Sequence, residues 1–319
     1  MGLIEHTKTY TGNDLETIFF RPMLTGPNAE ELGIRVIYNM PMPTTIQLWA
    51  AKSDILQNYT SGWTGGTSAD RKQKTIDMAK IKAELGFSAS DYFNQVYELI
   101  VNSASVNLDD LSGTELERAE TELFRKSIAE SLRTMMWVGD VDSNSRNLFD
   151  GLLTKVYKYP HKDIDMSDIT LSADTVTSIF DRLWEAADHK LKCLKSEGNL
   201  AFFVTSNVCD AYELWLDKFG GDAAYTDINT GRRELSYHGI RIIDMNIDAC
   251  LPLDVNESMH HVFLTDRRNL ALAVNTADYP GAEVRMWYNP DEMENRQRAT
   301  FLAGTEILDE TLVISASFI

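Results

Sequence analysis

The chain has 319 residues, of which 44% are hydrophobic and 24% charged, and its formal net charge is −18. This length allows one large domain or two smaller ones with a core each, and the net charge argues against a protein whose role is to grip nucleic-acid phosphates. No run of residues approaches the roughly 18 apolar residues of a membrane-spanning helix. The first residues, MGLIEHTKTYTGND, lack the apolar region of a secretory signal, so we expect neither a membrane span nor secretion.

Charge is unevenly distributed along the chain. Residues 1–82 carry nine Lys and Arg against eight Asp and Glu, whereas the remaining residues carry 21 against 40. This contrast would favour an N-terminal arm that lies across the acidic body of a neighbouring copy. Chance variation in surface charge gives the same numbers, so both explanations stand.

The first 50 residues are predicted to be extended. Prolines at positions 22, 27, 41 and 43 exclude a continuous helix, and the pieces at 34–38 and 44–49 are rich in β-forming residues. Apolar side chains such as Phe19 and Phe20 find little core of their own in this segment. We therefore expect the segment to lie on another surface.

Residues 58–70, NYTSGWTGGTSAD, are predicted to form a loop tip. The glycines at 62, 65 and 66 do not belong to a phosphate-binding GxxxxGK[ST] motif, and the Gly, Ser and Thr content is typical of a loop. A strand precedes this stretch and the run RKQKTIDMAKIKAELGF follows it. The sequence thus predicts a protruding, hairpin-like loop.

The clearest helix spans residues 114–138. Thr114 and Glu117 form a capping box, Gly139 has the position of a C′ glycine, and apolar residues repeat near the 3.6-residue period between them. At 1.5 Å per residue the helix would be about 37 Å long. Because the heptads do not continue, we expect the backbone helix of a domain and not a coiled coil.

The remaining elements mix helices and strands without regular βαβ alternation, which indicates an α+β fold. The predicted elements are a helix at 172–195 begun by Ser172 and ended by Gly198, a strand at 201–205, a helix at 208–219 capped by Asn207, a strand at 240–243, a pair of strands at 262–265 and 271–274 joined by the turn DRRN, and strands at 284–288, 298–303 and 311–318.

The stretch LSYHGIRIIDMNI, residues 235–247, is the strongest candidate for catalysis. His238 and Asp244 have the chemistry of a base and its orienting carboxylate, but the sequence shows no GxSxG elbow or other nucleophile motif. Close backbone approach at the start of a strand explains Gly239, and a position at a sheet edge explains His238. We predict no catalytic residue.

Metal and cofactor sites are not predicted either. His260 and His261 are adjacent, so on a strand they point to opposite faces. Asp163, Asp165 and Asp168 have calcium-like spacing but lack the central glycine and closing glutamate of an EF-hand loop, which favours a solvated acidic loop. The three cysteines are odd in number and far apart, which indicates reduced thiols in a core: Cys193, Cys209 and Cys250.

In order and pattern these segments resemble the major capsid proteins of tailed bacteriophages (Caudoviricetes), which have the Hong Kong 97-type fold. NLAFFVTSNVCDAYELWLD looks like the family's strand, turn and helix, and LSYHGIRIIDMNI like the strand in which an aromatic residue and a glycine precede an apolar run. HHVFLTDRRNLALAVN is similar to the next β pair, ATFLAGTEILDETLVIS to the returning peripheral strands, and KIKAELGFSASDYF to the return from the extended loop. The resemblance covers almost the whole chain and is one of pattern, not of invariant motifs.

The resemblance implies four structural parts. These are an N-arm at 1–41, an extended loop at 42–82, a peripheral domain at 83–149 and 283–319 built on the long helix, and an axial domain at 150–282. The N-arm and the extended loop would lie over neighbouring subunits. The axial domains would meet around the symmetry axes.

The resemblance also implies a structural protein and not an enzyme. Copies would self-assemble as hexamers and pentamers into the icosahedral head of the virion, after synthesis in the host cytoplasm, and would enclose double-stranded DNA without sequence-specific binding. A separate scaffolding protein, a portal and decoration proteins are the implied partners. Some members form a Lys–Asn cross-link between subunits. Lys52, Lys72 and Lys74 lie on or near the loop, but no partner is identifiable, so no cross-link is assigned.

Two other hypotheses remain open. An encapsulin, a bacterial nanocompartment protein of the same fold, would enclose cargo enzyme; encapsulins usually begin with a helix, whereas residues 1–50 here are predicted to be extended. A soluble α+β enzyme would be a monomer or small oligomer with a pocket of convergent titratable groups. The missing motif and the large N-terminal segment without a core argue against the enzyme.

Overall fold

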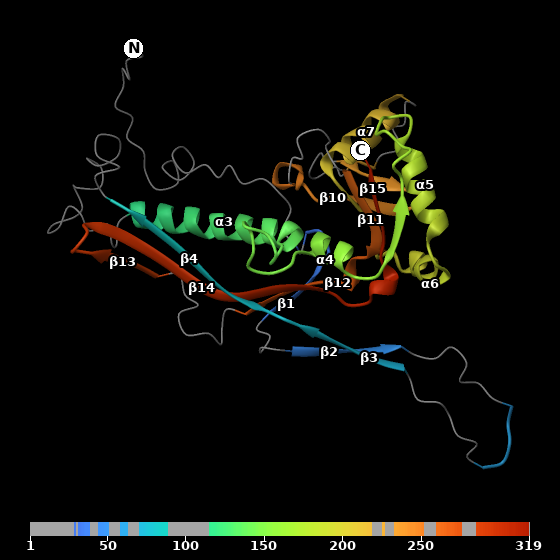
Figure 1. The fold of residues 1–319 in the computed structure, drawn as a ribbon, viewed down its shortest axis with the longest axis horizontal. Helices are drawn as coiled ribbons and strands as arrows, with labels where there is room; N and C mark the ends of the chain where they lie inside the picture. Colours follow the sequence, from blue (N-terminus) through green and yellow to red (C-terminus); the bar gives the residue numbers. More distant parts are fainter. Residues whose placement is uncertain are drawn as a thin grey trace.

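The computed structural model describes residues 29, 31–38, 44–50, 58–62, 70–88, 115–218, 225–226, 233–251, 260–275 and 285–318. Two sheets organise this part of the chain (Figure 1). The five-stranded sheet is centred on the long strand β14, which pairs with β12, β13 and β4, and β1 pairs in parallel with β12. Its strands are β1 (Arg35–Tyr38), β4 (Ala79–Phe87), β12 (Leu270–Asn275), β13 (Arg285–Asn289) and β14 (Glu294–Ile307).

The six-stranded sheet has the order β5-β15-β11-β6-β10-β9 and mixes parallel and antiparallel pairs. Its strands are β5 (Lys162–Asp165), β6 (Leu200–Val204), β9 (Ser236–Tyr237), β10 (Ile240–Asp244), β11 (His260–Asp266) and β15 (Ile314–Phe318). Together the two sheets confirm the predicted α+β class.

Every residue of β6 is buried, because both faces of the sheet are covered. Phe202 and its alternate neighbours pack into a core with the helices α5 (Val176–Ala186) and α7 (Ser206–Lys218). Phe203 faces the opposite way, into a second core that includes Trp137. A strand that supplies both cores fixes their relative position.

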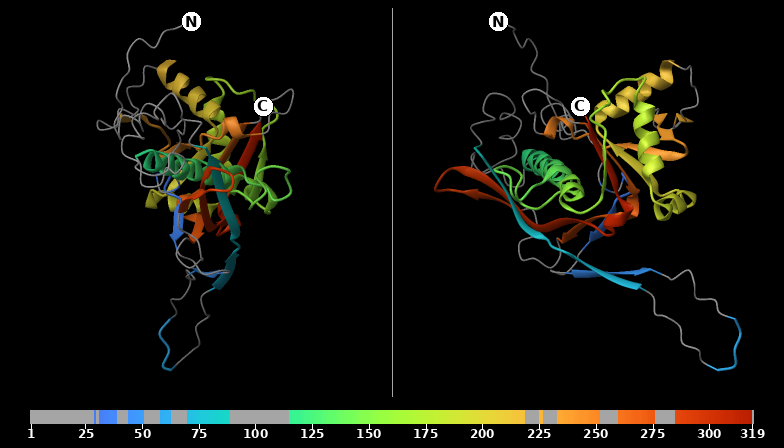
Figure 2. Two further views of the ribbon diagram at one scale, coloured as in Figure 1. Left: turned by 90° about the vertical axis from the view of Figure 1, so that its left-hand side faces the viewer. Right: turned by 45° about the vertical axis from the view of Figure 1, so that its right-hand side comes forward.

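The long helix α3 (Glu115–Val138) confirms the prediction for residues 114–138 and lies along the five-stranded sheet (Figure 2). Near its C-terminal end Trp137 is fully buried, and its ring centroid lies 5.7 Å from that of Phe203 and 6.2 Å from that of Phe263. The end of α3 is thus packed against the six-stranded sheet. No helix in the described part of the chain is long and apolar enough to cross a bilayer.

Two glycines let the chain double back at the end of α3. The Gly151 amide donates to the Gly139 carbonyl at 2.7 Å, just before the helix α4 (Leu152–Lys158). A Cβ at Gly139 would lie 2.3 Å from the Phe149 carbonyl oxygen, and a Cβ at Gly151 would lie 2.4 Å from the Trp137 carbonyl oxygen. Only glycine allows these two backbones to approach so closely.

The helix predicted at 172–195 is not continuous. The structure divides it into α5, α6 (His189–Cys193) and the 3-10 helix η2 (Leu194–Glu197). Ala187 has ψ 132, which ends α5, and Thr175 precedes α5 at the N-cap position that Ser172 was predicted to hold. The predicted end at Gly198 is confirmed, with φ 72. The helix predicted to be capped by Asn207 begins one residue earlier than that cap, at Ser206.

The predicted pairing of the strands at 262–265 and 271–274 is wrong. Both edges of β11 are taken by β15 and β6, so β12 leaves through the 3-10 helix η4 (Arg267–Asn269) and joins the other sheet. As a result β12 lies in the five-stranded sheet and β15 in the six-stranded one. The acidic run expected to be a loop begins instead as the strand β5.

The described part of the expected N-arm lies within the body of the molecule. Ala29, Leu32 and Ile34 are buried in the core around Trp137, and β1 extends the five-stranded sheet. This core contact makes the segment part of the chain's own fold. The rest of the predicted arm, residues 1–28, 30 and 39–41, lies outside the described residues.

The predicted hairpin-like loop is confirmed at its base. The strands β2 (Thr44–Ala50) and β3 (Asp70–Ile76) pair antiparallel, with Thr44 opposite Ile76. Residues 58–62 lie at the far end of this projection (Figure 1). We call β2, β3 and the chain between them the hairpin.

Substitution of Gly151 by Ala is expected to lower the free energy of unfolding by about 3 kcal/mol, because the new Cβ overlaps the Trp137 carbonyl. Gly86→Ala is the matched control, since its Cβ would meet only the Glu294 carboxylate at 3.4 Å. Urea unfolding of the unassembled chain measures both. Equal midpoints for the two variants would contradict the close-packed turn.

Candidate functional site

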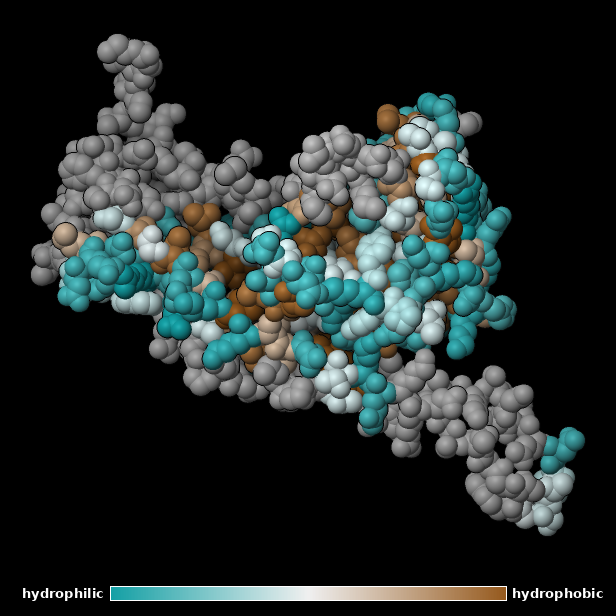
Figure 3. All heavy atoms as spheres, viewed as in Figure 1, coloured by the Kyte–Doolittle hydropathy of each residue, from teal (hydrophilic) through white to brown (hydrophobic). Residues whose placement is uncertain are grey.

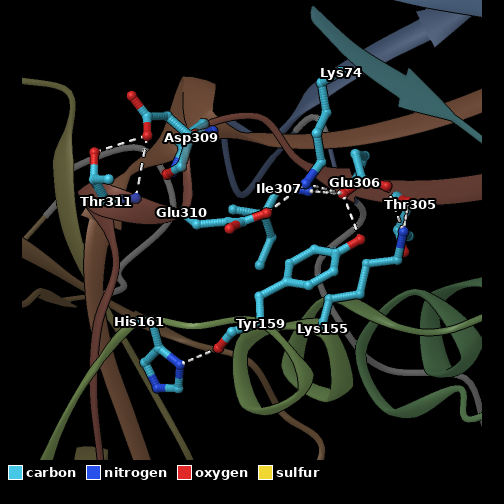
Figure 4. A network of polar contacts seen from close by, with 11 residues as sticks. Lys74, Lys155, Tyr159, His161, Thr305, Glu306, Ile307, Asp309, Glu310 and Thr311 are labelled. Carbon is cyan, nitrogen blue, oxygen red and sulfur yellow. Dashed lines mark hydrogen bonds and ion pairs between the residues drawn. The ribbon is translucent and has the colours of Figure 1, made fainter. Parts of the chain in front are cut away.

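A buried carboxylate at the end of β14 forms the centre of a polar junction (Figure 4). Glu306 is 3% exposed. It accepts a hydrogen bond from the Tyr159 hydroxyl at 2.9 Å and from the Lys155 ammonium at 2.6 Å, and the Lys74 ammonium lies 3.4 Å away. A carboxylate so deeply buried is stable as an anion only with such partners.

Lys74 brings the hairpin into this junction. It extends from β3, donates to Glu310 at 2.6 Å, and lies 4.2 Å from the centroid of the Tyr159 ring. Burial alone would lower the pKa of Lys74, but the hydrogen bond to Glu310 and the charges of both glutamates outweigh it and raise the pKa. The ammonium is therefore held as a cation against an aromatic face and two carboxylates.

Tyr159 is the aromatic part of the same junction. Burial raises the pKa of its phenol, and the nearby charge of Glu306 raises it further. The hydroxyl consequently stays protonated and available as a donor to Glu306. Of the three lysines considered for a cross-link, Lys74 is engaged here, while the side chains of Lys52 and Lys72 lie outside the described residues.

The other side of the hairpin base is apolar. Ile76 is fully buried and packs with Met78 and Leu302, while Ile46 of β2 joins the cluster from its edge. Between β3 and β4 the chain crosses β14 so closely that a Cβ at Gly304 would lie 2.2 Å from the Asp77 carbonyl oxygen. An ionic contact and an apolar contact thus hold the base of the hairpin against the body.

An apolar groove of about 430 Å³ lies between α3, β4 and β14. Figure 3 shows apolar side chains along the strip between α3 and β14. Leu85 and Leu148 line the groove and are exposed. The other lining residues include Ile81, Phe124, Ile128, Leu132, Met135 and Phe301.

The structure explains His238 and Gly239 as a hairpin turn. Both have positive φ, 50 and 75, and they join β9 to β10 with Tyr237 opposite Ile240. Two central residues with positive φ define a type I′ turn, whose backbone matches the twist of the strands. Apart from the two neighbours of Gly239 in the chain, no described residue has an atom within 4 Å of a Cβ built at Gly239, so close backbone approach was the wrong explanation.

His238 and Asp244 lie at opposite ends of β10 and do not form a dyad. The His238 Nε2 is 3.4 Å from Asp181, whereas Asp244 accepts hydrogen bonds from the Ser206 hydroxyl at 2.9 Å and from the Asn246 amide at 2.8 Å. Burial raises the pKa of Asp244. Its contacts join β10 to the start of α7, which is a structural role.

The three candidate calcium ligands each have a different protein partner. Asp168 forms a two-point ion pair with Arg182, both contacts at 2.8 Å. Asp163 accepts from the Ser315 hydroxyl at 2.8 Å, and Asp165 accepts from a backbone amide two residues ahead. Within the described residues, no group of three His, Cys, Asp or Glu side chains is arranged to hold a metal ion.

His261 and the cysteines complete the set of residues considered from sequence. The His261 Nδ1 is 2.7 Å from the Tyr157 hydroxyl, and burial, followed by the neighbouring His260, lowers the pKa of His261 to about 4. Burial raises the pKa of Cys209 to about 12, which fits the predicted core thiol. Cys193 is exposed, contrary to that prediction, and its Sγ lies 3.6 Å from the His189 Nε2. The four-residue spacing of this pair on a helix is visible in the sequence and was missed.

Comparison with known proteins identifies the fold. No protein-family model and no curated protein matches the chain. The capsid of an empty GTA particle is similar with a TM-score of 0.60 and 14% identity, over 99% of this chain and 95% of that one. The SrpI encapsulin of Synechococcus elongatus is similar with a TM-score of 0.55 and 12% identity, over 92% of this chain and 88% of that one. The procapsid of satellite phage P4 is similar with a TM-score of 0.55 and 10% identity, over 90% of this chain and 93% of that one. The chain thus has the Hong Kong 97-type capsid fold, as the sequence resemblance predicted.

Glu306→Gln is expected to lower the free energy of unfolding by about 3 kcal/mol, because it leaves the Lys155 ammonium buried without its counter-charge. Lys74→Met should cost about 1 kcal/mol, since Glu306 keeps its other two donors and Glu310 is partly solvated. Chemical denaturation of the unassembled variants compares them. Equal losses would mean that Glu306 is not the centre of the junction.

His238→Asn should leave the free energy of unfolding unchanged or raise it, because Asn accepts positive φ well and Asn-Gly favours type I′ turns. Gly239→Ala should lower it by about 1 kcal/mol, since an L residue is strained at φ 75. Thermal unfolding measures both effects. A large loss of stability in His238→Asn would point to a role beyond the turn.

Proposed function

We propose that this chain is the major capsid protein of a tailed phage, which self-assembles through hexamers and pentamers into an icosahedral head around double-stranded DNA. The observation that carries the proposal is the similarity in fold to the capsid of a GTA particle over nearly the full length of both chains. The role is structural and not catalytic. The separation of His238 from Asp244 along β10 supports this part of the proposal.

Surface left exposed by the single chain supports assembly. Tyr59, at the far end of the hairpin, is 95% exposed, and the groove between α3 and β4 presents Leu85 and Leu148 to solvent. Apolar groups held out in this way gain free energy when a second surface covers them. Repeated over many copies, modest contacts of this kind are enough to hold a closed shell.

The charge of the chain fits a container wall. A net charge of −18 repels the phosphates of enclosed DNA, so the packaged molecule stays free to move. We propose that the chain assembles with a separate scaffolding protein, a portal and decoration proteins. Synthesis would take place in the host cytoplasm, and the assembled chain would be part of the virion.

An encapsulin-type shell is the second candidate, because the Synechococcus elongatus SrpI encapsulin is also similar, with a TM-score of 0.55. Negative-stain electron microscopy and sizing of the purified chain separate the two. Uniform closed shells formed without any second protein would favour the encapsulin. Rings of five and six, or irregular shells that become uniform with a scaffolding protein, would favour the capsid. A stable monomer at all concentrations, with or without scaffold, would overturn both.

Tyr59→Ala is expected to raise the subunit concentration needed for assembly by about tenfold, the size of effect for an exposed aromatic anchor that becomes buried in an interface. The free energy of unfolding should stay within about 0.5 kcal/mol, because the side chain is almost fully exposed in the single chain. Light scattering during assembly measures the first quantity. Tyr59→Phe keeps the ring and is the control; a loss of assembly in Tyr59→Phe as large as in Tyr59→Ala would contradict burial of the ring.

A further inference from the structure

A second set of polar contacts begins where the junction around Glu306 ends. His161 follows α4 and lies between Tyr159 and the edge of the six-stranded sheet. Its Nδ1 is 2.9 Å from the Tyr159 carbonyl oxygen, and its Nε2 is 2.6 Å from the Ser315 hydroxyl. The Ser315 hydroxyl in turn donates to Asp163 at 2.8 Å.

The chemistry of these groups fixes the direction of two of the hydrogen bonds. A carbonyl oxygen only accepts, so the His161 Nδ1 carries a proton and donates to Tyr159. A carboxylate also only accepts, so Ser315 uses its single proton on Asp163. The contact between the His161 Nε2 and the Ser315 hydroxyl, at 2.6 Å, closes the chain of contacts. The order Asp163, Ser315, His161 places the hydroxyl in the middle and therefore differs from a hydrolase triad, in which the imidazole is central.

Tyr159 belongs to both sets of contacts. Its hydroxyl donates to Glu306 and its ring supports the Lys74 ammonium, while its carbonyl accepts from His161. Figure 4 shows Tyr159 between Lys74 and His161. The side chain of Tyr159 thus contacts the hairpin. Its backbone carbonyl is linked through His161 to the β5–β15 edge.

We propose that the segment 159–161 couples the direction of the hairpin to the six-stranded sheet. A shift of β15 relative to β5 changes the hydrogen bonds of Ser315, which lies opposite Asp163 in that pair and is 1% exposed. The change is transmitted by His161 to the Tyr159 backbone and from its ring to Lys74. Because the junction and the edge are packed and hydrogen-bonded, motion at one end is not absorbed between them.

In a closed shell this coupling would affect assembly; this role of the coupling rests on the proposed function. Subunits that occupy different positions in a closed shell need different hairpin directions. A contact made by the six-stranded sheet would then bias the hairpin of the same subunit before its neighbour arrives. Such a coupling is reciprocal: a contact at the six-stranded sheet changes the free energy of the hairpin's arrangement, and a contact at the hairpin changes that of the sheet by the same amount.

Hydrogen exchange of the unassembled chain tests the coupling separately from assembly. Ser315→Ala breaks the path at the sheet, and we expect amides of β3 to exchange at least about fivefold faster. In a Lys74→Met background the same substitution should add no further increase, because the path no longer reaches the hairpin. Asp168→Asn is the matched control: it removes an ion pair beside β5 but lies off the path, and it should leave β3 unchanged.

Two results would overturn the proposal. The first is equal exchange of β3 amides in Ser315→Ala and Asp168→Asn. The second is an equal acceleration of β3 and of the β13–β14 pair in Ser315→Ala, which would show general destabilisation in place of a path. Either result leaves the assembly experiments, and the proposed function, untouched.

Discussion

The fold depends on the double burial of the strand β6. Its side chains alternate between two cores, so Phe202 stabilises the packing of α5 and α7 while Phe203 stabilises the contact with Trp137 at the end of α3. Phe203 also stacks on Phe263, with ring centroids 5.0 Å apart. Because one five-residue strand supplies both cores, neither sheet can move as a unit without disturbing the other. The other elements, including the hairpin, are arranged around this strand and the two cores that it shares.

Around these two cores the described chain leaves apolar surfaces exposed to solvent. The hairpin is held by a buried ionic contact on one side and by Ile76 on the other, yet its far end has no partner within the described chain that covers Tyr59. The groove beside α3 is apolar and open in the same way. A molecule that anchors the base of its projection but leaves apolar groups in solvent is well suited to meet copies of itself.

Much of this fold could be predicted from local patterns. The 3.6-residue period located α3, and short apolar or β-rich runs located β6, β10 and the base of the hairpin. The failures were non-local or lacked a sequence marker: nothing near Ala187 resembles a helix breaker, and β11 and β12 look like a hairpin although their true partners are far away in sequence. In the site, Glu306 was overlooked. Its signal was a single charge within the apolar run FLAGTEIL, which on a central strand requires a buried counter-charge.

The strand β14 has a mechanical consequence. It is 14 residues long, roughly 46 Å at 3.3 Å per residue, and its antiparallel hydrogen bonds to β4, β12 and β13 run perpendicular to its length. A pull along the strand therefore loads all of these bonds in shear at the same time, whereas a pull across the sheet would open them one after another. Glu306 lies near the C-terminal end of β14. A load applied along β14 would thus act in the direction in which the sheet yields last.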